Sequence, residues 1–543
     1  MMKVSKALLS GALLMGLAMP LSAMAADQEI MQKIDSLSRE LEALKQQMKA
    51  NETKIKENES KTQETVKKVE QVENKSLGKW LEISGDYRFR YDYLRGKTAQ
   101  YFQLNPRNTD PNGSDLFLNV PGQTVKNNSL YTNRFGLNLH AKATEDVTVT
   151  ARLLMYKAAG AEDDASIRGS NGNQAFFADR AGIFDGTIGH VPGDNRLAVD
   201  RIFATWKNIL DQPIWFSIGR RPSTGGVPSH LRQNNEKPGN GGVPALLVDY
   251  AFDGVTLGWA PDITGLEGAY AKFCYGRGFQ DSVSGDEGNG LHNTDMLGVQ
   301  IVPYDTDAFR AEIQYNRGMN IFNAPNMLSG PFAGTPFGKT TFDLGDIDWY
   351  GVDFLGKVKN VGIGHLNWFA NGAISQTHPN DNTVSVGLQT TVTGFPNPLP
   401  TGAGLMYTGA QESTTGNAFY VGARYDVTST RTKIGAEFNH GSKNWITFTP
   451  AADDIWTSKL GARGNVYELY VIQEINAAPV SSYIAKAFFR VGFQYYDFDY
   501  TGSNNWVGAP VKISDLSASP LNAQMLTPLK SARDLYATME VKF

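Results

Sequence analysis

The clearest feature of this chain is an alternation of apolar and polar residues that begins near residue 80 and continues to Phe543. It stands out in LEISGDYRFRYDY (81–93), NRFGLNLHAK (133–142), VTVTARLLMY (147–156) and FYVGARYDV (419–427). A period of two predicts β-strands with one apolar and one polar face. The last nine residues repeat the pattern, because Leu535 and Phe543 fall on one side and Glu540 and Lys542 on the other.

The alternation predicts sixteen strands joined by connections that are alternately short and long, as in transmembrane barrels. Residues 244–260 are the one ambiguous segment, since a turn at Asp253-Gly254 would divide them in two; we treat them as one strand with a glycine bulge. The fold class is therefore an all-β, antiparallel transmembrane barrel of about 16 strands (16–18) over residues 81–543. The strands are expected at 81–94, 131–142, 147–157, 197–207, 214–221, 244–260, 267–278, 294–303, 308–317, 347–359, 361–376, 417–427, 432–441, 463–474, 485–499 and 533–543.

Residues 1–25 have the composition of a secretory signal peptide. Lys3 and Lys6 precede an apolar run, and Ala23-Met24-Ala25 offers a small-residue cleavage site. The apolar run is too short for a membrane anchor and ends at Pro20.

Residues 26–75 form a second region, rich in charge and nearly free of glycine. Apolar residues with a 4-3 spacing predict a left-handed coiled coil, in which two asparagines would fix the register. The alternative is a single solvated helix or a disordered tether. Residues 76–80 are expected to form a hinge. The seam consists of Ile34, Leu37, Leu41, Leu44, Met48, Asn51, Ile55 and Asn58.

Strand parity predicts which charges point into the barrel. If Tyr87 and Phe89 face lipid, then the residues between them face the lumen, and charges on the lipid face would cost about 2–4 kcal/mol at the midplane. The same rule turns Lys433, Glu437 and Glu468 inward. Sixteen strands leave room for an aqueous channel, so two roles are open: an arginine-rich wall that selects anions, or a set of ion pairs that stiffens the barrel. The predicted pore-lining residues are Asp86, Arg88, Arg90, Arg134, Arg152, Arg201, Arg221, Arg310, Glu312, Asp353, Arg424 and Arg490.

Loop and aromatic positions refine this expectation. The segment 219–243 is rich in glycine and proline and is expected either to fold back and narrow the pore, with Arg220, Arg221, His230 and Arg232 as lining groups, or to remain a solvated loop. Aromatic residues at strand ends, Trp349 and Tyr496 among them, are expected in the interfacial girdles.

Composition excludes several functions. The net charge of −4 provides no basic footprint for nucleic acid. Cys274 is the only cysteine, so an internal disulfide, a haem attachment motif and a cysteine metal clip are excluded, and we expect no cofactor or metal. His140 and His365 face the lumen by parity, so no lipid-facing Ser–His pair is predicted and the chain is not expected to be an enzyme.

A chain that ends in a strand on an aromatic residue resembles the bacterial outer-membrane barrel proteins. GRRPSTGGVP (219–228), GSKNWITFTPAADDIW (441–456) and GARGNVYELYVIQ (461–473) resemble a family of outer-membrane porin barrels of the 16-stranded type from anaerobically respiring Gram-negative bacteria. A coiled coil before the barrel is similar in layout to the sucrose-specific porin, and that resemblance implies a periplasmic helix and a homotrimer.

The expected function is therefore an outer-membrane porin for passive diffusion of small hydrophilic solutes or ions. The alternative is a barrel that sheaths a partner protein, such as the cytochrome of an electron conduit. The expected partners are outer-membrane lipid and two further copies of the chain, with peptidoglycan or a cytochrome as additional candidates.

Overall fold

The computed structural model divides the chain into two units, residues 1–79 and residues 80–543. In the first unit it describes residues 35–49, 51–52, 54, 56, 58 and 61. In the second it describes residues 80–105, 116–159, 192, 195–223, 226–235, 238, 246–280, 283, 292–321, 343–382, 384–385, 402–406, 410–449, 454–478, 485–524 and 527–543.

The first unit contains an α-helix at residues 35–49. Four of the predicted seam residues, Leu37, Leu41, Leu44 and Met48, lie on this helix and are exposed. Ile34 and Ile55 lie outside the described residues, as do the predicted signal peptide and most of the hinge. No helix in the described parts of the chain is both long and apolar enough to cross a membrane.

Within the described residues of the second unit, sixteen antiparallel strands close into a barrel. This confirms the predicted all-β antiparallel barrel and its strand number. The strands are β1 (Leu81–Thr98), β4 (Thr124–Lys142), β5 (Val147–Ala158), β6 (Ala198–Trp206), β7 (Ile214–Ser223), β8 (Tyr250–Trp259), β9 (Tyr270–Phe279), β10 (Thr294–Asp305), β11 (Phe309–Met319), β12 (Gly345–Val361), β13 (Gly364–Pro379), β16 (Thr415–Val427), β17 (Thr432–Gly441), β18 (Gly464–Glu474), β19 (Lys486–Phe498) and β20 (Leu529–Lys542).

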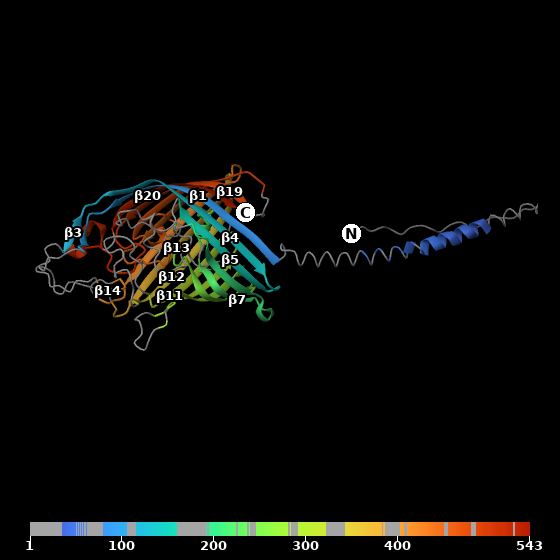
Figure 1. Ribbon diagram of the computed structural model, residues 1–543, viewed down its shortest axis with the longest axis horizontal. Coiled ribbons are helices and arrows are strands. Elements are labelled where there is room, and N and C mark those ends of the chain that lie inside the picture. The colour runs from blue at the N-terminus through green and yellow to red at the C-terminus, as the bar shows by residue number, and fades with distance from the viewer. Residues whose placement is uncertain are drawn as a thin grey trace, which may run out of the picture. The chain divides into compact units, whose positions relative to one another are not determined.

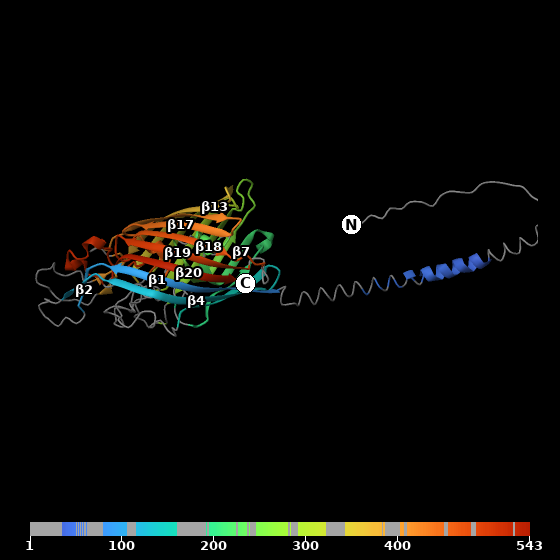
Figure 2. The ribbon, with the colours of Figure 1, turned by 90° about the horizontal axis from the view of Figure 1, so that it is seen from above.

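The barrel closes where the last strand pairs with the first. β20 pairs with β1, with Glu540 opposite Arg88, and the backbone of Phe543 exchanges two hydrogen bonds with Gly85. Figure 1 shows β1 beside β20, and Figure 2 shows β17, β18, β19, β20, β1 and β4 following one another across the wall. Closure leaves none of the sixteen described barrel strands with an unpaired edge. Two short hairpins lie in long connections: β2 (Tyr101–Leu104) pairs with β3 (Phe117–Val120), and β14 (Val384–Ser385) pairs with β15 (Gly402–Ala403).

Every strand of the barrel exposes at least one large apolar or aromatic side chain on its outer face. In β1 the exposed fraction is 39% for Phe89 but 3% for each of its neighbours Arg88 and Arg90. This alternation is the period of two that the sequence shows. One exposed residue from each strand, in chain order, is Phe89, Tyr131, Val149, Ile202, Ile218, Leu257, Phe273, Ile301, Ile313, Val352, Ile374, Val421, Ile434, Leu469, Phe493 and Leu535.

Two expectations about the wall are wrong. The strand predicted at 244–260 begins only at Tyr250, and its pairing with β7 and β9 runs through Gly254 without a bulge. The apolar residues just before Tyr250 pack inside the barrel instead. Trp349 and Tyr496 are fully buried inside the barrel and do not belong to a girdle at its surface.

Close backbone approach explains why Gly254 is glycine. It pairs with Gly219 on one side and Gly276 on the other, and a Cβ built there would lie 2.0 Å from the carbonyl oxygen of Tyr275. A backbone atom cannot move aside as a flexible side chain can. Gly372 on β13 differs, because the nearest atom to a Cβ there would be 3.9 Å away.

We therefore expect Gly254→Ala to lower the free energy of unfolding by about 1–3 kcal/mol, the usual cost of overpacking. Gly372→Ala is the matched control and should have little effect. Guanidinium unfolding of both variants in the same micelles measures the difference. Equal stability of the two variants would show that the register at Gly254 is not as described.

Candidate functional site in the barrel lumen

All twelve charged residues predicted at the pore wall lie on the inner face of the barrel. Arg88, Arg90, Arg424 and Arg490 are nevertheless at most 3% exposed, so they do not border open water. The pore-lining role of these four stays a prediction, because other parts of the chain cover their side chains.

Ion pairs neutralise much of the wall. Arg90 contacts Asp92 at 2.6 Å and Asp534 at 2.9 Å, and its guanidinium lies 4.5 Å from the centre of the Tyr536 ring. On β11, Arg310 contacts Glu312 at 2.8 Å and Asp305 at 3.1 Å. These pairs match the second role considered for the wall charges.

A more accessible group lies on β1, β4, β5 and β6. Arg152 contacts Asp86 at 2.7 Å, and Arg134 lies 3.9 Å from the same carboxylate. A β-bulge on β6 turns both Asp200 and Arg201 inward, and they contact each other at 3.2 Å. The three arginine side chains remain 13–23% exposed. Three cations thus face two carboxylates here, which leaves a net positive charge.

Residues 226–235 of the connection after β7 lie inside the barrel and include the helical turn α4 (Ser229–Arg232). His230, Leu231 and Arg232 are buried. This confirms the expected turn back into the pore for residues 226–235, whereas residues 224–225, 236–237 and 239–243 of the predicted segment lie outside the described residues. Of the four lining groups predicted for it, Arg221, His230 and Arg232 lie inside, whereas Arg220 is on the outer face beside Asp253, 3.8 Å away.

Wall cations hold the end of α4 through its backbone. Arg424 donates to the carbonyl oxygen of Leu231 at 2.6 Å, Arg490 donates to that of Arg232, and Lys542 donates to that of Gln233 at 2.7 Å. The last carbonyls of a helix have no partner within it and carry partial negative charge. Three successive carbonyls therefore each receive a cation from a different strand.

The side chain of Arg232, unlike its backbone carbonyl, contacts carboxylates. It contacts Asp454 at 2.6 Å and Glu468 at 3.1 Å. Burial alone would lower the pKa of this guanidinium, but the two carboxylates more than offset burial and raise its pKa well above the usual value.

A second segment, residues 454–463, enters the lumen from the connection between β17 and β18. Asp454 accepts a hydrogen bond from the backbone N–H of Lys459 at 2.9 Å, and the Lys459 ammonium contacts Glu437 and, at 2.5 Å, Glu468. Glu468 also accepts from Tyr536 at 2.6 Å. We call Arg232, Asp454, Lys459, Glu437 and Glu468 the lumen cluster.

The two inward connections also pair with each other. Phe448 donates its N–H to the carbonyl oxygen of Leu247 at 2.9 Å and accepts from the N–H of Asp249 at 3.0 Å. The Trp349 indole donates to the carbonyl oxygen of Ile446 at 2.9 Å. These residues belong to an apolar core inside the barrel, so much of the lumen is filled by packed protein.

Arg463 hydrogen-bonds to two of the long connections. The guanidinium donates to the carbonyl oxygens of Trp445 and Thr501, each at 3.0 Å, and of Asn505 at 2.6 Å. Burial lowers its pKa to about 9. One side chain thereby joins the second inward connection to the long connection before β20.

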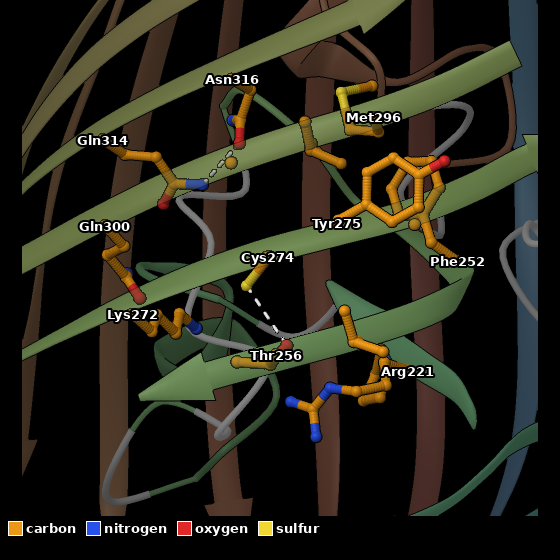
Figure 3. A pocket seen from close by; sticks show the side chains of 15 residues that line it. Arg221, Phe252, Thr256, Lys272, Cys274, Tyr275, Met296, Gln300, Gln314 and Asn316 are labelled. Carbon is orange, nitrogen blue, oxygen red and sulfur yellow. Dashed lines mark hydrogen bonds between the residues drawn. The ribbon is translucent and has the colours of Figure 1, made fainter. Parts of the chain in front are cut away.

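A polar pocket remains on the inner wall of β7–β11 (Figure 3). It is lined by Arg221, Thr256, Lys272, Gln300 and Asn316, with an apolar side formed by residues such as Phe252. Its space for water-sized molecules is ≈ 30 Å³.

Sequence reasoning found some of these residues and missed others. Parity places Glu437 and Glu468 inward, and both lie there. Lys272 was missed although the alternation of β9 contains the signal, since Phe273 points out. Asp454 and Lys459 lie in a connection without periodicity, so strand parity does not place them.

Comparison with known proteins places the chain in a family. Residues 124–543 match the model of the family described as protein of unknown function, DUF3373. The chain belongs to this family. Its description assigns no activity, so the porin function implied by the sequence resemblance stays a prediction. No protein among those with curated descriptions matches this chain.

Several solved structures resemble the barrel at low identity. They include OprB of Pseudomonas putida at high pH (10% identity, 86% of this chain, 95% of OprB, TM-score 0.40). The anion-selective porin from Comamonas acidovorans is 10% identical, with 85% of this chain and 99% of the porin covered at a TM-score of 0.37. Salmonella typhi OmpF in complex with daunomycin is 12% identical, with 85% of this chain and 97% of OmpF covered at a TM-score of 0.38. With TM-scores this low, these similarities carry no argument, and the barrel topology rests on the strand pairing of this chain.

The lumen cluster generates a stability prediction. Glu468→Gln keeps the shape of the side chain but removes a buried negative charge that faces Arg232 and Lys459. Because breaking a buried ion pair leaves an uncompensated charge, we expect unfolding free energy to fall by about 3–5 kcal/mol. Chemical unfolding in micelles measures it.

Glu82→Gln is the matched control, because the Glu82 side chain is exposed. It should change stability little. A Glu468 variant as stable as the Glu82 variant would mean that the cluster does not hold the inward segments.

Proposed function

We propose that the protein is an outer-membrane channel that passes small hydrophilic solutes or ions through a lumen narrowed by two of its own segments. The observation that carries this proposal is the opposite chemistry of the two faces of the wall. Each strand presents apolar side chains outward and, on most strands, charged or amide side chains inward. That combination suits a barrel in lipid around a polar interior.

The outer face supports placement in a membrane. Water-soluble proteins rarely expose a contiguous apolar patch larger than a few hundred square ångströms, whereas here the apolar residues recur on all sixteen described strands of the barrel. A closed barrel also satisfies its backbone hydrogen bonds internally, as hydrocarbon requires. The predicted signal peptide at residues 1–25 fits export to the outer membrane, with the N-terminal unit in the periplasm.

The inner face supports a channel for charged solutes. Arg134, Arg152 and Arg201 keep part of their side chains accessible and outnumber the carboxylates of Asp86 and Asp200. A ring of positive charge in a narrow bore attracts anions. We therefore place the predicted anion preference in this group and assign Arg424 and Arg490 to holding the α4 turn.

The lumen contents argue against the second function considered, a sheath around a partner protein. A sheath needs a bore wide enough for another chain, whereas this bore already holds the α4 turn, the 454–463 segment and an apolar core. The same contents explain why a channel formed here would be narrow.

A planar bilayer experiment tests the proposal. We expect the purified protein to show small single-channel steps and, across a salt gradient, a reversal potential of the sign for anions. Replacing Arg134, Arg152 and Arg201 together by Gln should shift that potential toward cations, because the local net charge changes from positive to negative.

Arg220→Gln is the control, since Arg220 lies on the outer face and should leave selectivity unchanged. Absence of channels from folded protein would reject the channel. Channels whose selectivity does not respond to the triple substitution would reject the role given to the three arginines.

We also propose that the N-terminal helix joins copies of the chain as a periplasmic coiled coil, most simply in a homotrimer. The supporting observation is that Leu37, Leu41, Leu44 and Met48, at seam spacing, are each about 60% exposed on the described helix. Apolar side chains in such a row need a partner surface. Contact of this helix with peptidoglycan stays a prediction.

Leu41→Asp with Leu44→Asp should therefore shift the protein in detergent from trimer to monomer, because two charges enter the seam. Sedimentation of the full chain measures the mass. The control is Glu40→Gln with Glu42→Gln, outside the seam, which should remain trimeric. If the leucine variant keeps the mass of the unmodified protein, the seam does not mediate assembly.

A further inference from the structure

We propose that the pocket on the inner wall of β7–β11 is a binding site for a small carboxylate that also carries a hydroxyl group. This inference deepens the proposed channel function, because it requires a route by which a solute reaches the pocket.

Strand pairing brings the pocket residues together in two adjacent rows. Thr256, Cys274, Gly298 and Asn316 are directly opposite one another on β8, β9, β10 and β11. In the next row Lys272, Gln300 and Gln314 are opposite one another. Figure 3 shows the side chains of Thr256, Cys274, Asn316, Lys272, Gln300 and Gln314 on successive strands, with Arg221 near Thr256. The site is thus fixed by the rigid wall rather than by loops.

The charge of the pocket is positive. Arg221 and Lys272 line it, and no carboxylate is found among its described lining residues. The Arg221 guanidinium donates to Ser217 and lies 4.8 Å from the centre of the Phe203 ring, which fixes its direction. The carboxylate of nearby Glu312 is engaged by Arg310 at 2.8 Å and by the Gln300 amide. An anion in the pocket would therefore meet two cations on its wall.

The amides add hydrogen-bonding groups that lack partners. Gln314 donates to the Asn316 side-chain oxygen at 3.0 Å, and the buried Asn316 side-chain nitrogen has no acceptor within the described structure. The side-chain oxygens of Gln300 and Gln314 likewise have no donor there. Buried polar atoms are nearly always paired. An incoming ligand that offers both an acceptor and a donor would satisfy them.

Gly298 makes room for this arrangement. A Cβ at that position would lie 2.6 Å from the Asn316 side-chain oxygen. On the other side, Phe252 and Met296 give the pocket an apolar surface. A carboxylate facing the cations, a hydroxyl facing the amides and a short carbon skeleton facing the apolar side match the three parts of the pocket.

The single cysteine of the chain provides the test. Cys274 lines the pocket and accepts a hydrogen bond from Thr256 at 3.3 Å. In the full-length protein, reconstituted in liposomes, the rate of thiol modification by a negatively charged methanethiosulfonate is compared with that of a positively charged one. The positive pocket should concentrate the anionic reagent, so we expect it to react about tenfold faster or more.

Ligand protection identifies the chemical class. Lactate should slow the reaction at concentrations about tenfold lower than propionate, which has the same carboxylate but lacks the hydroxyl that pairs the amide oxygens. Lys272→Gln should remove both the preference for the anionic reagent and the protection. Gly298→Ala should weaken protection by lactate toward that by propionate and keep the reagent preference. Arg220→Gln, on the outer face of the barrel, is the control and should change neither.

Equal rates for the two reagents, no reaction of Cys274 in the folded barrel, or equal protection by lactate and propionate would each overturn the proposal. The readout does not require conduction, so it separates the two ideas. Selective labelling of Cys274 in a barrel without single-channel steps would support the pocket and reject the channel. Single-channel steps without selective labelling would support the channel and reject the pocket.

Discussion

The structure depends on the neutralisation of charge inside the barrel. Glu468 is 1% exposed and has Lys459 at 2.5 Å and Arg232 at 3.1 Å. Buried charges are tolerated only when paired and hydrogen-bonded. Here the strand supplies the carboxylate and the two inward segments supply the cations. The buried charges of the barrel wall and those of the two inward segments therefore neutralise one another, and either set would be unpaired without the other.

The same principle divides the wall into parts with different roles. On β16, β19 and β20, cations are covered and hold the carbonyl groups of the α4 turn. On β4, β5 and β6, arginines keep part of their surface and a net positive charge. On β7–β11, two cations and unpaired amides surround empty space. A polar route through the lumen would pass the arginines of β4–β6 and the pocket on β7–β11, while the cations of β16, β19 and β20 hold the α4 turn that narrows the bore.

The barrel could be predicted from the sequence because strands repeat a local signal. A period of two gives the inner and outer face of each strand, and it places Arg88 inside and Phe89 outside without knowledge of the partners. The filling could not be predicted in this way. Trp445 and Phe448 lie in a connection without periodicity, and the contact of Arg424 with the Leu231 carbonyl joins positions 193 residues apart. The strand predicted at 244–260 fails for the same reason, since its first apolar residues pack inside the lumen.

Hydrogen exchange measured by mass spectrometry on the full chain in nanodiscs tests the central claim most directly. If the lumen cluster and the wall cations hold the two inward segments, then amides in residues 229–235 and 454–463 should exchange slowly, at rates close to those of β18. Exchange of these amides as fast as that of solvent-exposed turns, with β18 still protected, would contradict the account.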